Sequence, residues 1–440
     1  MQHTMKAMKG CIFPSGSAVT NEIVSSLQYC KNIEYIGVNS TCHNEYATLL
    51  KTNYSDCPPY TDAVSCIDYL LRICEIEECN FIIPTMDSSH YLLSKYESRF
   101  TDKQIRVISS SFETNQLCLS KKMTYSRLHD IIKCPFVYEY PSSSDEWNPF
   151  DFPVFIKPDI GYGSKHCKVV HSMDELNKSY SSDSLVLEYL TGDEFTIDCF
   201  TANGKLMYVG VRQRVLYKNG LSIITKMSDV ASPEYDSIYN IATKIHNAIP
   251  FRGAWFFQLK YDKENKLTLL EISTRIAGAS SINRLNGCNL VLLSILMHFG
   301  NPIAISSNNI SDTVYKLHRN KVDDSVLLRY ENVYVDLDDT LIVANAVNTK
   351  VLSFLYKCRN YDINVFLITR HRHDILETLK RFCICADVFN GGIIHITNES
   401  DKKSDFIKDH SIFIDDSFRE RNFHKENVLV LDVDGTEFFI

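Results

Sequence analysis

The chain has 440 residues, of which 45% are hydrophobic and 23% charged, and its formal net charge at pH 7 is -8. This length exceeds what one hydrophobic core usually serves, so about two to four domains are expected. The acidic balance excludes a surface that coats nucleic acid, although it leaves room for a local basic cleft that binds phosphates.

The fifteen cysteines do not form a disulfide pattern, because they are scattered and many lie inside apolar runs. The one close pair, Cys383-Ile384-Cys385, has strand spacing, and we interpret it as two small buried side chains, not a metal site. The apolar stretch 10–13 is too short for a signal peptide, and no stretch reaches the roughly 18 residues of a membrane span. We therefore expect a cytoplasmic protein with reduced thiols and with no membrane or nucleic-acid partner.

The first segment alternates strands with helices. The expected strands are 9–13, 33–38, 81–84 and 105–109, and the expected helices are 21–30, 62–77 and 88–96. Strands that alternate with helices at this spacing form a parallel sheet. Residues 1–111 are therefore predicted to be one α/β domain.

From residue 112 the pattern changes to strands rich in β-branched and aromatic residues. A helix is expected at 120–132, followed by a linker that contains Pro141, Ser142 to Ser144 and Pro149. The expected strands are 154–157, 167–170, 185–189, 194–201, 206–215, 253–261 and 267–273, with a helix at 233–248. This pattern is typical of antiparallel α+β folds. We predict a second domain at 112–325, with a polar connection that starts at 301–312.

A compact α/β pattern returns near residue 330. Its expected strands are 333–335, 364–369, 412–414 and 428–433. We predict a third domain at 330–440, and a multidomain fold of the mixed α/β and α+β class for the chain. The stretch 431–436 partly repeats the acidic pattern of 336–340 but is interpreted as a terminal strand and turn.

The second domain contains a lysine beside a glycine loop. Phe155-Ile156-Lys157-Pro158 ends a strand, and Gly161 and Gly163 follow. A lysine ammonium at this point supplies charge for a polyphosphate, and backbone N–H groups in a glycine loop can approach phosphate oxygens closely. A plain hairpin with a glycine turn is the alternative.

A second motif follows in Leu187-Glu188-Tyr189-Leu190, with Gly192 and Glu194 close behind. A hinge of this kind can hydrogen-bond an adenine edge through its backbone, and the carboxylate after it can accept hydrogen bonds from ribose hydroxyls. The alternative for both glutamates is solvated charge at strand ends.

Oxygen ligands appear on two later strands. Gln258 lies in one strand and Glu271 in the next, and antiparallel pairing would bring them together on one face. A few oxygen ligands shared with phosphate oxygens are what Mg²⁺ requires. Glu271 lies among leucine and isoleucine, where burial of a carboxylate is unfavourable and no structural role accounts for it. Arg275 shortly afterwards can meet a terminal phosphate.

In their order, these motifs resemble the ATP-grasp superfamily, in the branch of carbamoyl-phosphate synthase large-subunit halves and carboxylate–amine ligases. The resemblance begins with Lys121-Lys122 at a helix start and implies a pre-ATP-grasp domain at 1–111 and a nucleotide-binding subdomain at about 135–195. It implies phosphate contacts from Lys122 and Lys157, adenine contacts at Glu188, Tyr189 and Leu190, a ribose contact from Glu194, metal ligation by Gln258 and Glu271, and acyl-phosphate steering by Arg275. ATP and Mg²⁺, with Mn²⁺ as a substitute, are the implied cofactors.

Two positions depart from that family pattern. Ser273-Thr274-Arg275 stands where Asn-Pro-Arg is usual, and serine is a poorer Mg²⁺ ligand than an asparagine carbonyl, so a second metal is in doubt. The helix opens with two lysines where Asp-Lys is common. The loop 278–289 and the leading domain are expected to line an acceptor pocket, with Arg284 meeting a carboxylate.

Polar residues end three strands of the third domain. Asp336-Leu337-Asp338-Asp339-Thr340 follows the first strand, Thr369 ends the second, and Asp415-Asp416 ends another, with Lys402-Lys403 between the last two. Parallel α/β sheets place their chemistry at the carboxyl ends of strands. Acidic loop ends without catalysis are the alternative.

Residues 330–440 resemble the haloacid-dehalogenase (HAD) phosphatase superfamily in these motifs. The resemblance implies that Asp336 is the nucleophile and Asp338 the general acid and base. It implies that Thr369 and Lys403, favoured over Lys402, hold phosphoryl oxygens. Asp415, with or without Asp416, would bind Mg²⁺ together with Asp336 and the Asp338 carbonyl. The short segments after Thr340 and Thr369 leave room for only a minimal cap.

Two enzyme activities are therefore expected on one chain. The first is an ATP-dependent ligase that joins a carboxylate to an amine or ammonia, and the second is a phosphohydrolase that acts on a phosphorylated small molecule. In the alternative, only the phosphatase is active, and the ATP-grasp part is a nucleotide-binding or regulatory module. A structural protein on degenerate folds is less consistent with the intact acidic motifs. A homodimer is expected from the family resemblance.

Overall fold

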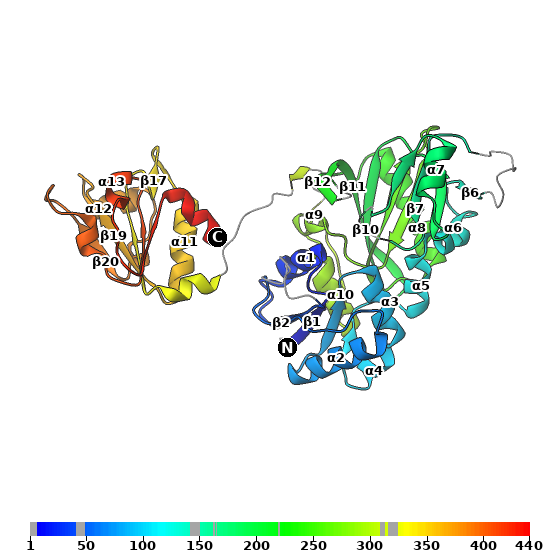
Figure 1. Cartoon of the computed structure of the whole chain (residues 1–440), viewed down its shortest axis with the longest axis horizontal. Helices are drawn as coiled ribbons and strands as arrows, with labels where there is room; N and C mark the ends of the chain where they lie inside the picture. Colours follow the sequence, from blue (N-terminus) through cyan, green and yellow to red (C-terminus); the bar gives the residue numbers. More distant parts are fainter. Residues whose placement is uncertain are drawn as a thin grey trace. The chain divides into compact units, whose positions relative to one another are not determined.

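The computed structural model describes residues 7–40, 49–140, 150–161, 163, 165–218, 221–308, 313–315 and 324–440. The chain forms two compact units, Met1–Lys316 (unit 1) and Leu317–Ile440 (unit 2) (Figure 1). The predicted linker at 141–149 and the end of the predicted connection, 309–312, lie outside the described residues. Along the described parts of the chain, no helix is long and apolar enough to cross a membrane.

Unit 1 begins with a parallel sheet in the order β3-β2-β1-β4-β5. Its strands are β1 (Met8–Phe13), β2 (Ile33–Val38), β3 (Asn53–Tyr54), β4 (Phe81–Pro84) and β5 (Arg106–Val107). The helices between them are α1 (Ala18–Leu27), α2 (Ala63–Ile76), α3 (Asp87–Lys95) and α4 (Glu97–Thr101). Strand β4 is apolar and buried along its length, and α3 starts almost at once after it. This places Asp87 at the carboxyl edge of the sheet, where parallel α/β folds place functional groups.

The centre of unit 1 is a sheet of antiparallel pairs in the order β14-β13-β10-β11-β12-β15. Its strands are β10 (Glu194–Ala202), β11 (Lys205–Lys218), β12 (Leu221–Met227), β13 (Gly253–Tyr261), β14 (Leu267–Ser273) and β15 (Thr313–Tyr315). Helices α5 (Phe112–Leu119), α6 (Lys121–Leu128) and α8 (Pro233–Ala248) contribute to the core on one face, and α9 (Ser281–Leu285) and α10 (Leu290–His298) follow β14. Side chains of α10 share a second core with β1 and β10, which joins this sheet to the first.

A smaller antiparallel sheet, in the order β6-β9-β7-β8, completes the described part of unit 1. It consists of β6 (Val137–Tyr138), β7 (Val154–Pro158), β8 (Lys168–Val170) and β9 (Ser184–Glu188), with helix α7 (Met173–Ser179). Val154, Ile156 and Val186 form its core together with Leu176 of α7. Alternation along β7 therefore buries one face in this core.

Unit 2 is a parallel sheet in the order β20-β19-β16-β21-β22. Its strands are β16 (Asn332–Val335), β19 (Asn364–Thr369), β20 (Gly392–His395), β21 (Ser411–Ile414) and β22 (Val428–Leu431). Its helices are α11 (Thr349–Asn360), α12 (Ile375–Arg381) and α13 (Phe418–Arg421), and a hairpin of β17 (Ile342–Val343) and β18 (Ala346–Val347) follows β16. The 3-10 helices are η2 (Asp324–Arg329), η3 (Ala386–Val388), η4 (Lys403–Phe406) and η5 (Val433–Phe439). Strands β16 and β21 are neighbours, so the acids that follow them meet at one edge.

The predicted mixed class, with parallel and antiparallel sheets, is confirmed. The interpretation of Cys383 and Cys385 as buried strand residues is wrong, because both thiols are exposed. The chain leaves α12 at Arg381, and Cys383 adopts a φ of 55°, which belongs to a turn. The predicted last strand is also too long: β22 ends at Leu431, and η5 follows.

Candidate functional site

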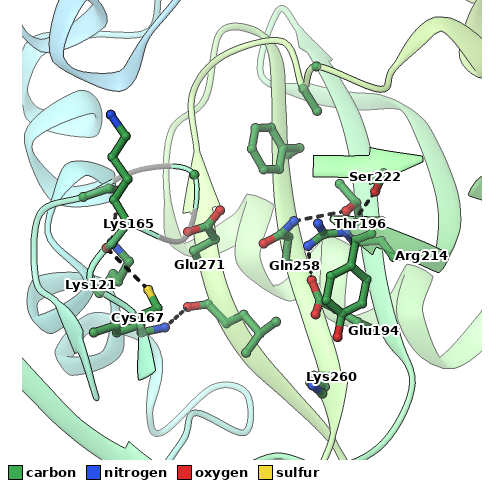
Figure 2. Close-up of a pocket in the computed structure, with 18 of the residues that line it drawn as sticks. Lys121, Lys165, Cys167, Glu194, Thr196, Arg214, Ser222, Gln258, Lys260 and Glu271 are labelled. Carbon is green, nitrogen blue, oxygen red and sulfur yellow. Dashed lines mark hydrogen bonds and ion pairs between the residues drawn. The ribbon is translucent and has the colours of Figure 1, made fainter. Parts of the chain in front are cut away.

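Unit 1 contains a cavity of about 960 Å³ that is lined from its two antiparallel sheets and from the starts of α1 and α3. Figure 2 shows side chains of the central sheet and of the smaller sheet facing each other across it. The predicted residues that line it are Lys157, Gly161, Gly163, Glu188, Tyr189, Leu190, Glu194, Gln258, Glu271 and Arg275. Strands that are distant in the sequence therefore bring nearly all the residues that were predicted to bind the nucleotide into one cavity.

Two buried lysines contribute positive charge to this cavity. The Lys157 ammonium donates to the Tyr125 hydroxyl at 2.8 Å and to the Leu270 carbonyl at 2.9 Å. Burial lowers the pKa of Lys157 to about 8, although Glu271 opposes the shift. Lys121 lines the cavity and donates to the Asp159 carbonyl at 3.0 Å.

Lys122, the predicted phosphate ligand, has an exposed side chain and does not line the cavity. Only its backbone N–H faces this region, where it donates to the Asp159 carboxylate at 2.7 Å. One step along a helix turns a side chain by about 100°, so the neighbouring Lys121 takes the inward position. Of these two lysines, Lys121 is therefore the one that lines the cavity.

Gln258 and Glu271 are directly opposed in the register of β13 and β14. The Gln258 amide nitrogen donates to the Thr196 hydroxyl at 3.2 Å, and Figure 2 shows the amide oxygen on the side of Glu271. A carboxylate and an amide oxygen side by side, in a cavity that also holds lysines, fit a magnesium ion shared with phosphate oxygens. These residues are the ones that could hold the predicted metal.

The carboxylates of Glu188 and Glu194, predicted for the adenine and the ribose, are already engaged with neighbouring groups. The Glu188 carboxylate accepts from the Phe136 backbone N–H at 2.9 Å, so its side chain holds the β6–β9 region together. The Glu194 carboxylate is paired with Arg214, and the Arg214 Nε donates to the Ser222 hydroxyl at 2.9 Å. Glu194 still lines the cavity, and Figure 2 shows this pair at one end of it.

Asp87 is a cavity residue that sequence reasoning missed. Its carboxylate accepts a hydrogen bond from the Ser273 hydroxyl and lies 3.0 Å from Nε of Arg275. Although burial acts to raise it, the pKa of Asp87 is held below its ordinary value by the Arg275 guanidinium and by these hydrogen bonds. The Arg275 guanidinium also lies 5.0 Å from the centre of the Phe256 ring. Ser273, which departs from the family pattern, is thus part of a clamp that holds Arg275.

A buried polar network lies beside the cavity. Arg212 lines the cavity and makes two bonds to Asp198, at 2.5 and 3.2 Å, and Asn283 donates to the same carboxylate at 2.8 Å. Arg284, which was expected to meet a substrate carboxylate, lies 3.3 Å from Glu22 of α1 and does not line the cavity. Of the predicted acceptor loop, Gly278 and Ala279 do reach the cavity.

Unit 2 gathers opposite charges at the carboxyl edge of its sheet. The Lys403 ammonium lies 2.7 Å from Asp336 and 2.6 Å from Asp415, and all three side chains are almost fully buried. Burial raises the pKa of Asp336 to about 6; Lys403 opposes the shift and Asp415 adds to it. Burial likewise raises the pKa of Asp415. Lys402, the alternative lysine, is exposed.

Three acids of this cluster could hold a cation. Oxygens of Asp336, Asp415 and Asp416 lie within 4.8 Å of one another. Asp416 is held by Thr340, whose hydroxyl lies 3.3 Å from its carboxylate and accepts from its backbone N–H at 3.0 Å. Carboxylate oxygens at this spacing fit Mg²⁺, which takes one or two carboxylates and keeps several waters.

Asp338 and Thr369 meet at the same edge through a histidine that was not predicted. Nδ1 of His371 lies 2.9 Å from both oxygens of the Asp338 carboxylate, and the His371 backbone N–H donates to the Thr369 hydroxyl at 3.1 Å. The run Arg370-His371-Arg372-His373 after a strand end was a usable signal for a basic site. It does not show which of its members turns inward.

The family described as ATP-grasp in the biosynthetic pathway with Ter operon matches residues 181–320, nearly all of them in unit 1. Among curated proteins, the vancomycin/teicoplanin A-type resistance protein VanA of Enterococcus faecium is 23% identical over 204 residues. The alignment covers 41% of this chain and 59% of that protein, so the chain spans about three fifths of this relative.

Solved structures resemble the chain over about 70% of its length. N5-carboxyaminoimidazole synthetase from Staphylococcus aureus, complexed with ADP, has a TM-score of 0.57 at 15% identity and covers 71% of this chain and 82% of its own. L-amino acid ligase from Bacillus licheniformis has a TM-score of 0.55 at 15% identity, with coverages of 67% and 75%. Likeness at this identity shows the fold, which the chain shares with these enzymes over that length, and the ATP-grasp family match covers residues 181–320 of it.

Proposed function

We propose that unit 1 is an ATP-dependent ligase that joins a carboxylate to an amine or ammonia through an acyl-phosphate. The observation that carries this proposal is the opposed pair Gln258 and Glu271 in one cavity with Lys157 and Arg275. The set combines oxygen donors for a divalent cation with cations for phosphate oxygens. The family match and the ligases among the similar structures support the same chemistry.

Several cavity residues have a part in binding ATP. Lys121 and Lys157 contact phosphate oxygens, the backbone of Glu188 to Leu190 holds the adenine edge, and Glu194 accepts from the ribose. Gln258 and Glu271 would hold Mg²⁺, which supplies charge neutralisation between the phosphates when bound. The glycines at 161 and 163 let backbone N–H groups approach the phosphates.

The protein acts by positioning and by neutralising charge. Lys157 and Arg275 hold the γ-phosphoryl group while the substrate carboxylate oxygen attacks phosphorus and the bond to ADP breaks. Arg275, fixed by Asp87, then holds the acyl-phosphate oxygens. The amine attacks the acyl carbon, inorganic phosphate leaves, and the amine proton passes to solvent.

This ligase function is tested by ADP release from Mg-ATP with panels of carboxylates and amines. ADP release should require one member of each panel and should be lost in Lys157→Met and Glu271→Ala. Lys263→Met, an exposed lysine outside the cavity, is the matched control. Unchanged ADP release in both cavity variants would show that this site is not the ligase site.

We infer a second activity for unit 2, a Mg²⁺-dependent phosphohydrolase of the HAD type. The supporting observation is the direct contact of Lys403 with Asp336 and Asp415 at the ends of β16 and β21. The Asp336 oxygen attacks phosphorus and the leaving oxygen takes a proton from Asp338. Water activated by Asp338 then cleaves the aspartyl-phosphate and releases phosphate.

The phosphohydrolase is tested with p-nitrophenyl phosphate and Mg²⁺. Hydrolysis should be lost with chelator and in Asp336→Asn, and retained in Asp434→Asn, an acid of the partly similar stretch near the chain end. Hydrolysis without ADP release from any substrate pair would favour the alternative in which unit 1 only binds a nucleotide. Both activities together make the chain a bifunctional enzyme.

A further inference from the structure

His371 is held at both ring nitrogens and at both backbone polar groups. Nδ1 lies 2.9 Å from the Asp338 carboxylate oxygens, and Nε2 lies 2.9 Å from the Thr378 hydroxyl. The His371 backbone N–H bonds to Thr369, and its carbonyl lies 2.8 Å from Nε2 of His395. The residue is also buried, so its ring has one orientation.

Thr378 decides which atom donates and which accepts in the bond to Nε2 of His371. The Thr378 hydroxyl has a single proton and donates it to the Asp374 carbonyl at 2.8 Å, as a threonine within the first turn of α12 does. Its oxygen therefore accepts from Nε2 of His371. With Nε2 fixed as a donor to Thr378, Nδ1 is directed at Asp338, and the ring cannot turn over without losing both bonds.

Asp338 needs such a support because its side chain is about half exposed (53%), whereas that of Asp336 is almost buried (10%). Asp338 follows β16 in a tight turn in which Asp339 has a φ of 55°. An exposed carboxylate on this turn would sample several rotamers and share its hydrogen bonds with water. A group that transfers a proton must be held within hydrogen-bond reach of the reacting oxygen.

We propose that His371 is a positioning residue of the phosphohydrolase, which holds the Asp338 carboxyl toward the Asp336 site and ties it to Thr369 and α12. The proposal rests on the function proposed for unit 2. His371 itself contacts neither the substrate nor the cation. It keeps Asp338 in place to give its proton to the leaving oxygen when the phosphorus–oxygen bond breaks, and to take a proton from water in the second step.

The experiment compares three substitutions in the full chain with Mg²⁺. His371→Leu removes the contact with Asp338, and His371→Asn restores it, because the asparagine amide can place either its nitrogen or its oxygen close to the position of Nδ1. Thr378→Val removes the acceptor that orients the ring. His424→Leu is the matched control, since this histidine of unit 2 is exposed, whereas the ring of His373 packs against that of His371.

Comparing two substrates distinguishes a positioning role of His371 from a role in folding alone. An alkyl phosphate has a poor leaving group that needs a proton, whereas p-nitrophenolate leaves without one. His371→Leu should lower kcat for the alkyl phosphate by about 100-fold with little change in KM, the loss expected when general acid catalysis fails. With p-nitrophenyl phosphate the first step persists and the second slows, so an Asp336 phosphate adduct should accumulate in acid-quenched samples and be seen by mass spectrometry. His371→Asn should recover most of the activity.

Equal losses on both substrates, no adduct, or no recovery in His371→Asn would overturn the role of His371. If His371→Leu loses the melting transition of unit 2, Thr378→Val provides the same comparison with a smaller change in volume. The underlying function fails in a different way. In that case Asp336→Asn hydrolyses p-nitrophenyl phosphate as fast as the unchanged protein, and no adduct forms in any variant.

Discussion

The two candidate sites of this chain are built in opposite ways. The site of unit 1 is a cavity of about 960 Å³ lined from antiparallel strands, in which Gln258 and Glu271 lie directly opposite each other. The site of unit 2 is a tight cluster at the edge of a parallel sheet, in which Lys403 touches two carboxylates. The first is shaped to enclose a large ligand, and the second to hold a small, highly charged group.

The electrostatics of the two sites differ accordingly. In unit 1 a buried cation is destabilised, since burial lowers the pKa of Lys157 to about 8. In unit 2 the buried anions are destabilised, since burial raises the pKa of Asp336 to about 6. Each site therefore lacks the charge that its proposed ligand would supply. Phosphate oxygens would supply negative charge in unit 1, and a divalent cation would supply positive charge in unit 2.

The largest expected effect comes from a crossed pair of substitutions that breaks one site at a time. Asp336→Asn should lower phosphate release from p-nitrophenyl phosphate by at least about 10⁴-fold, because it removes the nucleophile. It should leave ADP release by unit 1 unchanged. Lys157→Met should have the reverse pattern. A loss of both activities from either substitution would show that the sites do not work independently.

The next largest effect concerns the clamp on Arg275. Asp87→Ala should lower the rate of ADP release by about 10²- to 10³-fold at saturating ATP, the range for one misplaced charge-stabilising group. Hydrolysis by unit 2 should be unchanged. Asp68→Asn, an exposed acid that pairs with Arg99, is the control. An Asp87→Ala enzyme with a normal rate and only a raised KM would assign Asp87 to substrate binding instead.

A third test concerns Glu22, a buried acid of unit 1. Its partner Arg284 lies farther from it than Lys403 lies from the buried acids of unit 2. Arg284 lies 3.3 Å away, and burial raises the pKa of Glu22 to about 7. A carboxyl with a raised folded pKa stabilises the fold fully at low pH and loses that contribution as the pH rises from its unfolded pKa to its folded one. Between about pH 4.5 and 7, the free energy of unfolding should therefore fall by about 3 kcal/mol relative to Glu22→Gln.

The measurement for Glu22 is the thermal midpoint of the unit 1 transition across this pH range. The midpoint of the unchanged protein should fall relative to that of Glu22→Gln as the pH rises. Glu34→Gln, an exposed glutamate of β2, should run parallel to the unchanged protein at every pH. Parallel curves for Glu22→Gln as well would mean that Glu22 is not held as the structure describes.

Most strands and the pairing of β13 with β14 could be predicted because each depends on local sequence patterns. Alternation in two adjacent strands is enough to place Gln258 and Glu271 on one face, but not to fix their register, which shifts beside Gln258. Asp87 could not be predicted, because it meets Ser273 across 186 positions of sequence and no spacing connects them. The choice of Lys121 over Lys122 depends on the rotation of α6, which packing against neighbouring strands decides.

The same limit appears in unit 2. Asp336, Asp338 and Asp415 follow strands that are visible in the sequence, and Thr369 ends one. His371 comes two residues after a strand end, and its orientation depends on a bond to Thr378 in α12, a helix that was not predicted. The prediction that Cys383 and Cys385 are buried was wrong for a related reason, because it assumed strand spacing where the chain turns.

The smallest expected effect is a change of ATP affinity with pH, which tests the contrast between the buried lysines Lys157 and Lys403. Lys157 bonds to a hydroxyl and a carbonyl, and burial lowers its pKa to about 8, whereas Lys403 lies between two carboxylates. Phosphate contact requires the charged form of Lys157, which is lost as the pH rises through 8. The affinity for ATP should therefore fall about tenfold between pH 7 and pH 9, as the charged fraction falls by that factor. Isothermal titration with Mg-ATP measures this change, and Lys157→Met should bind weakly at both pH values. An affinity that is constant between these pH values would mean that Lys157 keeps its charge, and the contrast between the two lysines would then be lost.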